Sequence, residues 1–134
     1  PFQIALSDET SLIDLNYQNL ETGGALHALG DPIDSKGERF EPVFALPTLS
    51  YRLDDFVAQF GLPKPNHIKM DVDGLEFSIL KGGENTLNHA GLQSVLLEIE
   101  GNEDSDRFDA WFDGIGMTLH SRRDYNSLYV RKIE

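Results

Sequence analysis

The stretch HIKMDVDGLEFSILKGG, residues 67–83, decides the fold class of this 134-residue chain. It opens with a short run at 67–72 that predicts a strand, and Gly74 supplies a tight turn after it. Apolar residues at helical spacing begin at Leu75, and the glycine pair at 82–83 ends that helix. The stretch therefore predicts a strand, a turn and a helix, the repeating unit of parallel α/β sheets.

The segments on either side continue this alternation of strands and helices. Strands are predicted at 2–6, 12–17, 43–46, 94–99, 117–121 and 128–133, and helices at 53–60, from about 75, and at 105–115. Thr48 and Ser50 are candidate caps of the first helix. The last two strands are close enough to form an antiparallel hairpin. We predict an α/β fold with a mainly parallel sheet that ends in this hairpin.

Residues 21–42 form the longest predicted loop within an expected single domain at 1–134. The segment carries several glycines and prolines and shows no sustained period. A loop of this length is uncommon in a compact domain, and it is usually a binding lid, a mobile segment or an excursion outside the core.

Charge and composition exclude several kinds of partner. The chain has 23 acidic and 11 basic residues, a formal net charge of −12, which would repel the phosphates of nucleic acids. No apolar run approaches the ~20 residues that a membrane span needs, and no signal segment opens the chain. The chain has no cysteine, and its four histidines lack ligand spacing, so no metal site is expected. We expect a soluble, cytoplasmic protein that binds no nucleic acid and has no membrane span.

The stretch at 67–83 resembles a segment of FkbM-type S-adenosylmethionine-dependent methyltransferases, whose form is roughly I-K-[IM]-D-[VI]-[ED]-G-x-E-x-x-[IV]-L-K-G. ALSDET at 5–10, RLDDFV at 52–57 and VLLEIEG at 95–101 resemble other segments of that family in the same order and spacing. The resemblance implies a Rossmann-like class I methyltransferase fold. It also implies S-adenosylmethionine as the cofactor and a small-molecule hydroxyl, usually of a sugar or natural product, as the methyl acceptor.

One part of the family pattern is absent from the sequence. Such domains open with a strand, a glycine-rich turn of the kind D-x-G-A-N-x-G and a second strand, whereas Gly23 and Gly24 follow no apolar strand and open no helix. The resemblance thus implies a partial sheet with an open gap between the strands at 2–6 and 67–72. We expect a missing N-terminal segment or a homo-oligomer to complete it. This chain alone is expected to bind the cofactor weakly or not at all and to be inactive.

Asp71 is the first candidate for chemistry, because ligands of open α/β sheets bind beyond the carboxyl ends of the strands. By position and by resemblance it is predicted to be both catalytic and cofactor-binding, orienting the acceptor hydroxyl or taking its proton. This prediction requires 67–72 to be an inner strand facing a crevice shared with the opening strand. A carboxylate that only fixes the turn is the alternative.

Further carboxylates are weaker candidates. Glu76 is a predicted catalytic residue if it turns towards Asp71, but with Asp73 it also has the spacing of a helix capping box. Glu98 is a predicted catalytic residue because it lies near the carboxyl end of its strand, where a solvated carboxylate is the alternative.

Ser7 and Asp8 end the first predicted strand. The resemblance implies that both bind the adenine side of the cofactor. A plain turn would use the same residue types.

Two other functions stay open. MDVDG at 70–74 also resembles the D-x-D-G-T start of haloacid-dehalogenase-type Mg²⁺-dependent phosphohydrolases, although Leu75 stands at the threonine position and no later acidic pair follows. A partial methyltransferase fold could also serve as a non-catalytic interaction or structural module.

Overall fold

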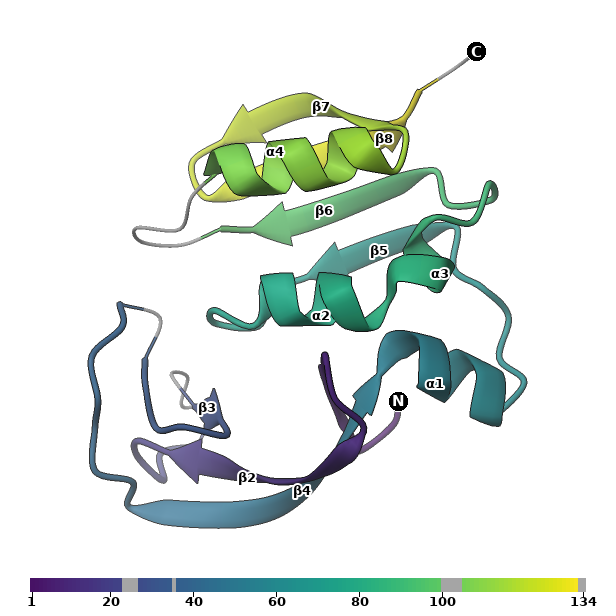
Figure 1. Ribbon diagram of the computed structural model, residues 1–134. Coiled ribbons are helices and arrows are strands. Elements are labelled where there is room, and N and C mark those ends of the chain that lie inside the picture. The colour runs from purple at the N-terminus through teal and green to yellow at the C-terminus, as the bar shows by residue number, and fades with distance from the viewer. Residues whose placement is uncertain (23–26, 35, 100–104, 133–134) are drawn as a thin grey trace.

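The computed structural model describes residues 1–22, 27–34, 36–99 and 105–132, which form a mixed α/β fold around two four-stranded sheets (Figure 1). The N-terminal sheet has the order β1 (Ala5–Ser7), β4 (Phe44–Arg52), β2 (Ser11–Tyr17) and β3 (Ala28–Leu29). The C-terminal sheet has the order β5 (His67–Met70), β6 (Ser94–Glu98), β8 (Asn126–Arg131) and β7 (Met117–Arg123). The helices are α1 (Leu53–Gln59), α2 (Glu76–Gly82), α3 (Glu84–Leu87) and α4 (Ser105–Gly114). None of the described helices is long and apolar enough to cross a membrane.

The prediction of a mainly parallel sheet was wrong. Only the pairs β1–β4 and β5–β6 are parallel, whereas β2–β3, β2–β4, β6–β8 and β7–β8 are antiparallel. Parallel neighbours need a long crossover, which α2 and α3 supply between β5 and β6. The described part of the connection from β2 to β4 contains no helix, and β4 returns antiparallel to β2. The predicted C-terminal hairpin is confirmed as β7–β8.

The first predicted helix lacks the predicted caps. Thr48 and Ser50 lie inside β4, where Ser50 pairs with both Ala5 and Ser11 and is buried. Helix α1 instead follows Arg52 and has no side-chain cap. Small hydroxyl residues suit caps locally, but here the pairing of distant strands outweighs that preference.

The hydrophobic core belongs to the C-terminal sheet. Helices α2, α3 and α4 lie on the same side of this sheet (Figure 1). Leu80 of α2, Leu97 of β6 and Phe112 of α4 are fully buried where the helices meet the sheet. Phe112 stacks on Tyr129 with ring centroids 3.9 Å apart. Burial of these large side chains provides the main favourable contribution to folding.

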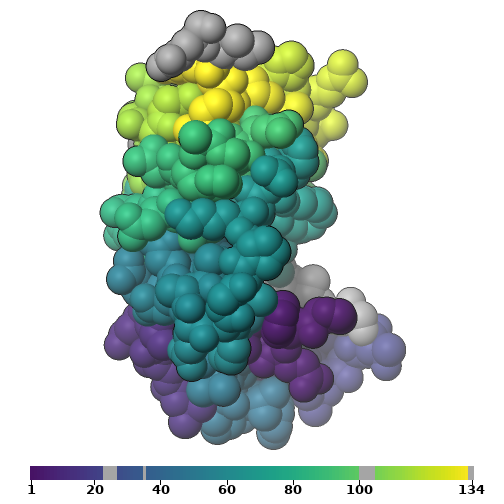
Figure 2. Space-filling model, turned by 90° about the vertical axis from the view of Figure 1, so that its right-hand side faces the viewer, coloured from purple at the N-terminus to yellow at the C-terminus, as the bar shows by residue number. Residues whose placement is uncertain are grey.

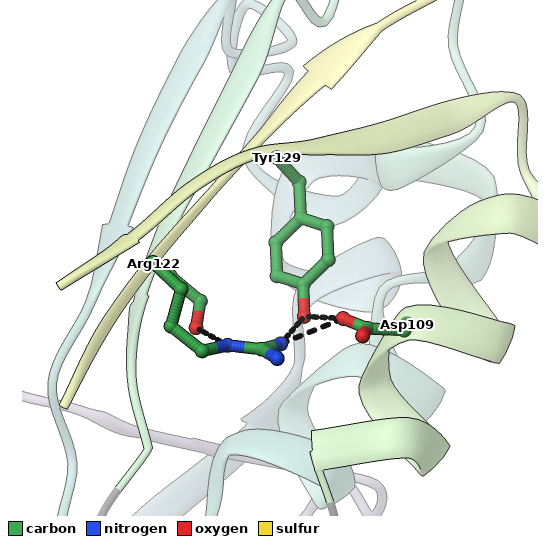
Figure 3. A network of polar contacts seen from close by, with 4 residues as sticks. Asp109, Arg122 and Tyr129 are labelled. Atoms are coloured by element: carbon green, nitrogen blue, oxygen red, sulfur yellow. Dashed lines mark hydrogen bonds and ion pairs between the residues drawn. The ribbon is translucent and has the colours of Figure 1, made fainter. Parts of the chain in front are cut away.

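A polar network ties α4 to the hairpin (Figure 3). The Tyr129 hydroxyl donates to Asp109 Oδ1 at 2.6 Å, and Arg122 Nη2 donates to the same oxygen at 2.7 Å. Arg122 Nε donates to Ser127 Oγ at 2.8 Å. Burial and the neighbouring Asp109 carboxylate raise the pKa of Tyr129, so this hydroxyl stays protonated at neutral pH.

The two sheets meet where the end of α2 packs against β1. A Cβ atom on Gly82 would lie 2.0 Å from the Ser7 carbonyl oxygen, a distance that only glycine permits. Nearby, Asp54 of α1 accepts hydrogen bonds from the backbone N–H groups of Asn85 and Thr86 at 2.9 and 2.7 Å. Partial burial opposes the ionisation of Asp54, but these hydrogen bonds hold its pKa below the ordinary value.

The described part of the long predicted loop adds to the N-terminal sheet. Its strand β3 pairs with β2, and Ile33 forms an isolated bridge with Arg39. Gly23 and Gly24, which were considered as a glycine-rich turn, lie outside the described residues.

Candidate functional site

A cavity of about 820 Å³ separates the two sheets. Ile4, Ala5 and Leu6 line it on the N-terminal side, and Ile68, Lys69, Met70, Asp71 and Val72 line it on the other. Strands β1 and β5 end their sheets, and within the described residues no strand pairs with their outer edges. The side view in Figure 2 shows the outline indented between the purple and teal segments. The gap that the resemblance implied is therefore present.

The prediction that 67–72 is an inner strand was wrong for the described chain. Strand β5 is the outer strand of its sheet and ends at Met70, because no described segment pairs with its free edge. Asp71 nevertheless follows its carboxyl end and lines the cavity together with Ala5 and Leu6 of the β1 segment. Asp71 thus shares a cavity with the opening strand as predicted, but the tip of that strand at Ser7 and Asp8 does not line it.

Asp71 is partly exposed and paired with a lysine. Lys69 Nζ donates to Asp71 Oδ2 at 2.6 Å, and the Asp71 side chain is 44% exposed. The hydrogen bond from Lys69 lowers the pKa of Asp71 below its ordinary value. Asp71 is therefore a carboxylate at neutral pH, able to accept a hydrogen bond or proton from a ligand.

Glu98 lies beside Asp71 on the neighbouring strand. Strand β6 runs parallel to β5 with Leu97 opposite Met70, which places Glu98 level with Asp71. Glu98 also contributes to the lowered pKa of Asp71, after the larger effect of Lys69. Glu98 is not among the residues that line the cavity. The structure thus brings two predicted catalytic carboxylates together, with only Asp71 facing the cavity.

Sequence reasoning assigned no role to Lys69. The Asp71 carboxylate, and to a smaller extent Glu98, raise its pKa, so Lys69 is a cation that orients Asp71. Residues two apart on a strand point to the same face, so the spacing of Lys69 and Asp71 was a usable signal.

Glu76 is buried and does not line the cavity with Asp71. It is 2% exposed, and its carboxylate accepts hydrogen bonds from the N–H groups of Val72 and Gly74 at 3.3 and 3.0 Å. Burial raises the pKa of Glu76 even though these hydrogen bonds oppose the shift. Its contacts fix the turn, and its catalytic role stays a prediction.

The predicted capping box does not form. Asp73 has a φ of 53°, in the left-handed region, and helix α2 follows Leu75 without a side-chain cap. The Glu76 carboxylate instead accepts a hydrogen bond from the Gly74 N–H and so restrains the turn before the helix.

Ser7 and Asp8 do not line the cavity. The buried Ser7 hydroxyl shares a 2.7 Å hydrogen bond with Ser50 Oγ and donates to the Glu9 carbonyl at 3.0 Å. Asp8 is exposed at the end of β1. These contacts make Ser7 a turn-forming residue, and cofactor binding by either residue stays a prediction.

No group of three or more metal-binding side chains occurs within the described residues. The phosphohydrolase alternative requires Asp71 and Asp73 to act at one metal ion. Asp71 lines the 820 Å³ cavity, whereas Asp73 lines a second one. No specific feature of the site favours that alternative.

A family model described as the methyltransferase FkbM domain matches residues 2–126. The chain belongs to the FkbM methyltransferase family. The match extends from the start of the β1 segment to the first residue of β8 and includes both carboxylates of the site. No curated protein and no solved structure matches the chain. Family membership supports a methyltransferase-type function in general.

Proposed function

We propose that this FkbM domain takes part in S-adenosylmethionine-dependent O-methylation of a small molecule. The observation that carries the proposal is the position of Asp71, an ionised carboxylate at the end of a strand and at the wall of an 820 Å³ cavity. Ligand sites of open α/β sheets occur at this end of the strands. The neighbouring Glu98 and Lys69 give the site a fixed pattern of charge.

The cavity suits such a cofactor in size and chemistry. Its volume falls within the roughly 300–1,000 Å³ of small-molecule sites, and most of its walls are apolar. Leu6, Ile68 and Met70 could contact an adenosine moiety, whereas Asp71 could attract a cationic group. When bound, S-adenosylmethionine would supply the methyl group from its positively charged sulfonium.

Asp71 would act on the acceptor. Its carboxylate would hold the acceptor hydroxyl by a hydrogen bond and take the proton that leaves as the oxygen is methylated. Lys69 would keep the carboxylate ionised and oriented. Residues of the 27–37 segment that line the cavity, such as Leu29, would contribute to the choice of acceptor.

We also propose that further strands, supplied by an N-terminal segment or by a second copy, pair with the free edges of β1 and β5 and leave the part of the cavity beside Asp71 to the cofactor. The two outer edges and the apolar cavity walls support this proposal, because exposed edges with apolar flanks attract additional strands.

Titration of the ¹⁵N-labelled chain with S-adenosylhomocysteine tests cofactor binding. We expect shifts of the amides of Leu6, Met70 and Val72, and about ten-fold weaker binding by Asp71→Asn because a charge-assisted hydrogen bond is lost. Asp14→Asn removes the same charge at an exposed position away from the cavity and is the matched control. An absence of shifts at millimolar ligand, or equal effects of the two variants, would contradict the proposal.

A further inference from the structure

A second cavity of about 430 Å³ adjoins the first. Residues of the 27–37 segment form one wall, and the turn at 73–75 forms the other. His27, Leu29 and Leu75 line both cavities, so the two spaces are neighbours along a shared wall.

A single turn separates the two cavities. Asp71 and Val72 line the larger cavity, whereas Asp73 and Gly74 line the smaller one. Behind the turn, the buried Glu76 carboxylate holds the N–H groups of Val72 and Gly74. The partition is therefore restrained by the protein itself and does not require a ligand to form.

An unsatisfied polar atom lies at the shared wall. His27 Nδ1 is buried and makes no hydrogen bond to the described residues, and its ring packs against Tyr17 with centroids 4.3 Å apart. An unpaired buried polar atom is unfavourable, so a polar group brought by a ligand would stabilise this position.

The smaller cavity is acidic. Asp31, Asp34 and Asp73 line it, and no lysine or arginine does. Asp31 pairs with Arg39 at 3.3 Å, where both side chains are largely exposed, and the Asp34 carboxylate accepts backbone N–H groups of the same segment. In the larger cavity Asp71 is the one acidic residue among the described lining residues, and Lys69 pairs with it. The excess of carboxylates in the smaller cavity favours a cationic ligand and repels an anionic one.

We propose that the smaller cavity receives the methyl acceptor and selects a hydroxyl compound that carries an ammonium group, as an amino sugar does. That the bound compound is the methyl acceptor rests on the proposed function. The charge selectivity and the place of binding follow from the cavity alone. The acceptor would extend from the smaller cavity past the turn at 73–75 into the larger cavity, where Asp71 lines the wall.

The test is an NMR titration of the ¹⁵N-labelled chain with glucosamine, glucose and glucose 6-phosphate. We expect glucosamine to shift the amides of Leu29, Gly37 and Gly74 and to bind roughly three-fold or more tightly than glucose, since one exposed charge pair changes affinity by roughly two- to five-fold. Glucose 6-phosphate should bind most weakly. The preference for glucosamine should fall as the salt concentration rises.

Two variants sharpen the test. Asp73→Asn removes one charge while keeping a residue type that tolerates the left-handed φ of this position, so the preference for glucosamine should fall. Asp14→Asn should leave the preference unchanged. Equal binding of the three sugars, no binding of any, or shifts elsewhere on the chain would overturn the inference. Failure of S-adenosylhomocysteine to bind, with glucosamine selectivity intact, would overturn the proposed function alone.

Discussion

The two sheets differ in how completely they bury their apolar side chains. Every member of the buried core cluster lies between Met70 and Tyr129, around the C-terminal sheet. Of the exposed large apolar side chains in the described structure, all but Phe60 and Tyr125 lie within residues 1–52. The exposed large apolar side chains within residues 1–52 are Phe2, Leu12, Leu20, Ile33, Val43, Phe44, Leu46 and Leu49. The C-terminal sheet therefore carries most of the buried apolar contacts of the described chain, whereas the N-terminal sheet exposes apolar surface.

The difference follows from the helices. Three helices supply buried side chains to one face of the C-terminal sheet, whereas the N-terminal sheet is contacted mainly by α1 and by the end of α2. A sheet face without a covering layer leaves its apolar residues in water.

Truncating one phenylalanine in each region should give the largest contrast. Phe112 is fully buried, so Phe112→Ala should lower the free energy of unfolding by about 3–5 kcal/mol. Phe44 is 48% exposed, so Phe44→Ala should cost about 1 kcal/mol or less. Urea denaturation of both variants measures the difference. Equal losses would show that the two sheets contribute alike.

The contact between the sheets should be the next most sensitive point. Gly82→Ala places a methyl group against the Ser7 carbonyl, which should cost about 1–3 kcal/mol because backbone must move. Gly114→Ala is the matched control: a Cβ there meets no atom within 4 Å, and alanine favours a helix. Thermal unfolding should separate the two variants. A tolerated Gly82→Ala would mean that the sheets do not pack as described.

The fold could be predicted where local patterns determine structure. The stripe of Phe108 and Phe112 predicted α4, and the alternation at 12–17 predicted β2. Strand direction and strand partners could not be predicted, because they depend on residues distant in the sequence. Ser50 illustrates this limit, since its burial arises from pairing with Ala5 and Ser11.

The candidate site was predictable to a similar degree. Asp71 follows from a general rule about strand ends, and the parallel pair β5–β6 brought Glu98 beside it. The burial of Glu76 could not be predicted, because it goes with a turn in which Asp73 has a left-handed φ and the Glu76 carboxylate accepts hydrogen bonds from Val72 and Gly74. His27 gave no signal, since it lies in a segment without a periodic pattern.

The turn at the boundary of the two sheets should respond to pH through Glu76. Its folded-state pKa is raised above the ordinary value of 4.5, so the folded protein holds this proton more tightly than the unfolded chain. The stabilising contribution of this group is complete below pH 4.5 and is lost as the pH rises through the raised pKa.

Glu76→Gln removes this dependence. Wild type and variant should be compared by urea denaturation from about pH 4 to about pH 8. The stability of the wild type relative to the variant should fall across that range. A constant difference between the two proteins would contradict the raised pKa, and Glu84→Gln, an exposed residue, is the control.

The smallest change in stability is expected on the exposed face of the N-terminal sheet. Leu12 and Leu49 face each other across β2 and β4 and are 69% and 54% exposed. Replacing both by threonine, which suits a strand, should change the free energy of unfolding by about 0.5 kcal/mol or less. Self-association measured by sedimentation velocity should decrease, because contiguous exposed apolar surface promotes contact between molecules. A loss of more than about 2 kcal/mol would instead mean that these leucines are covered in solution, which would remove the contrast between the two sheets.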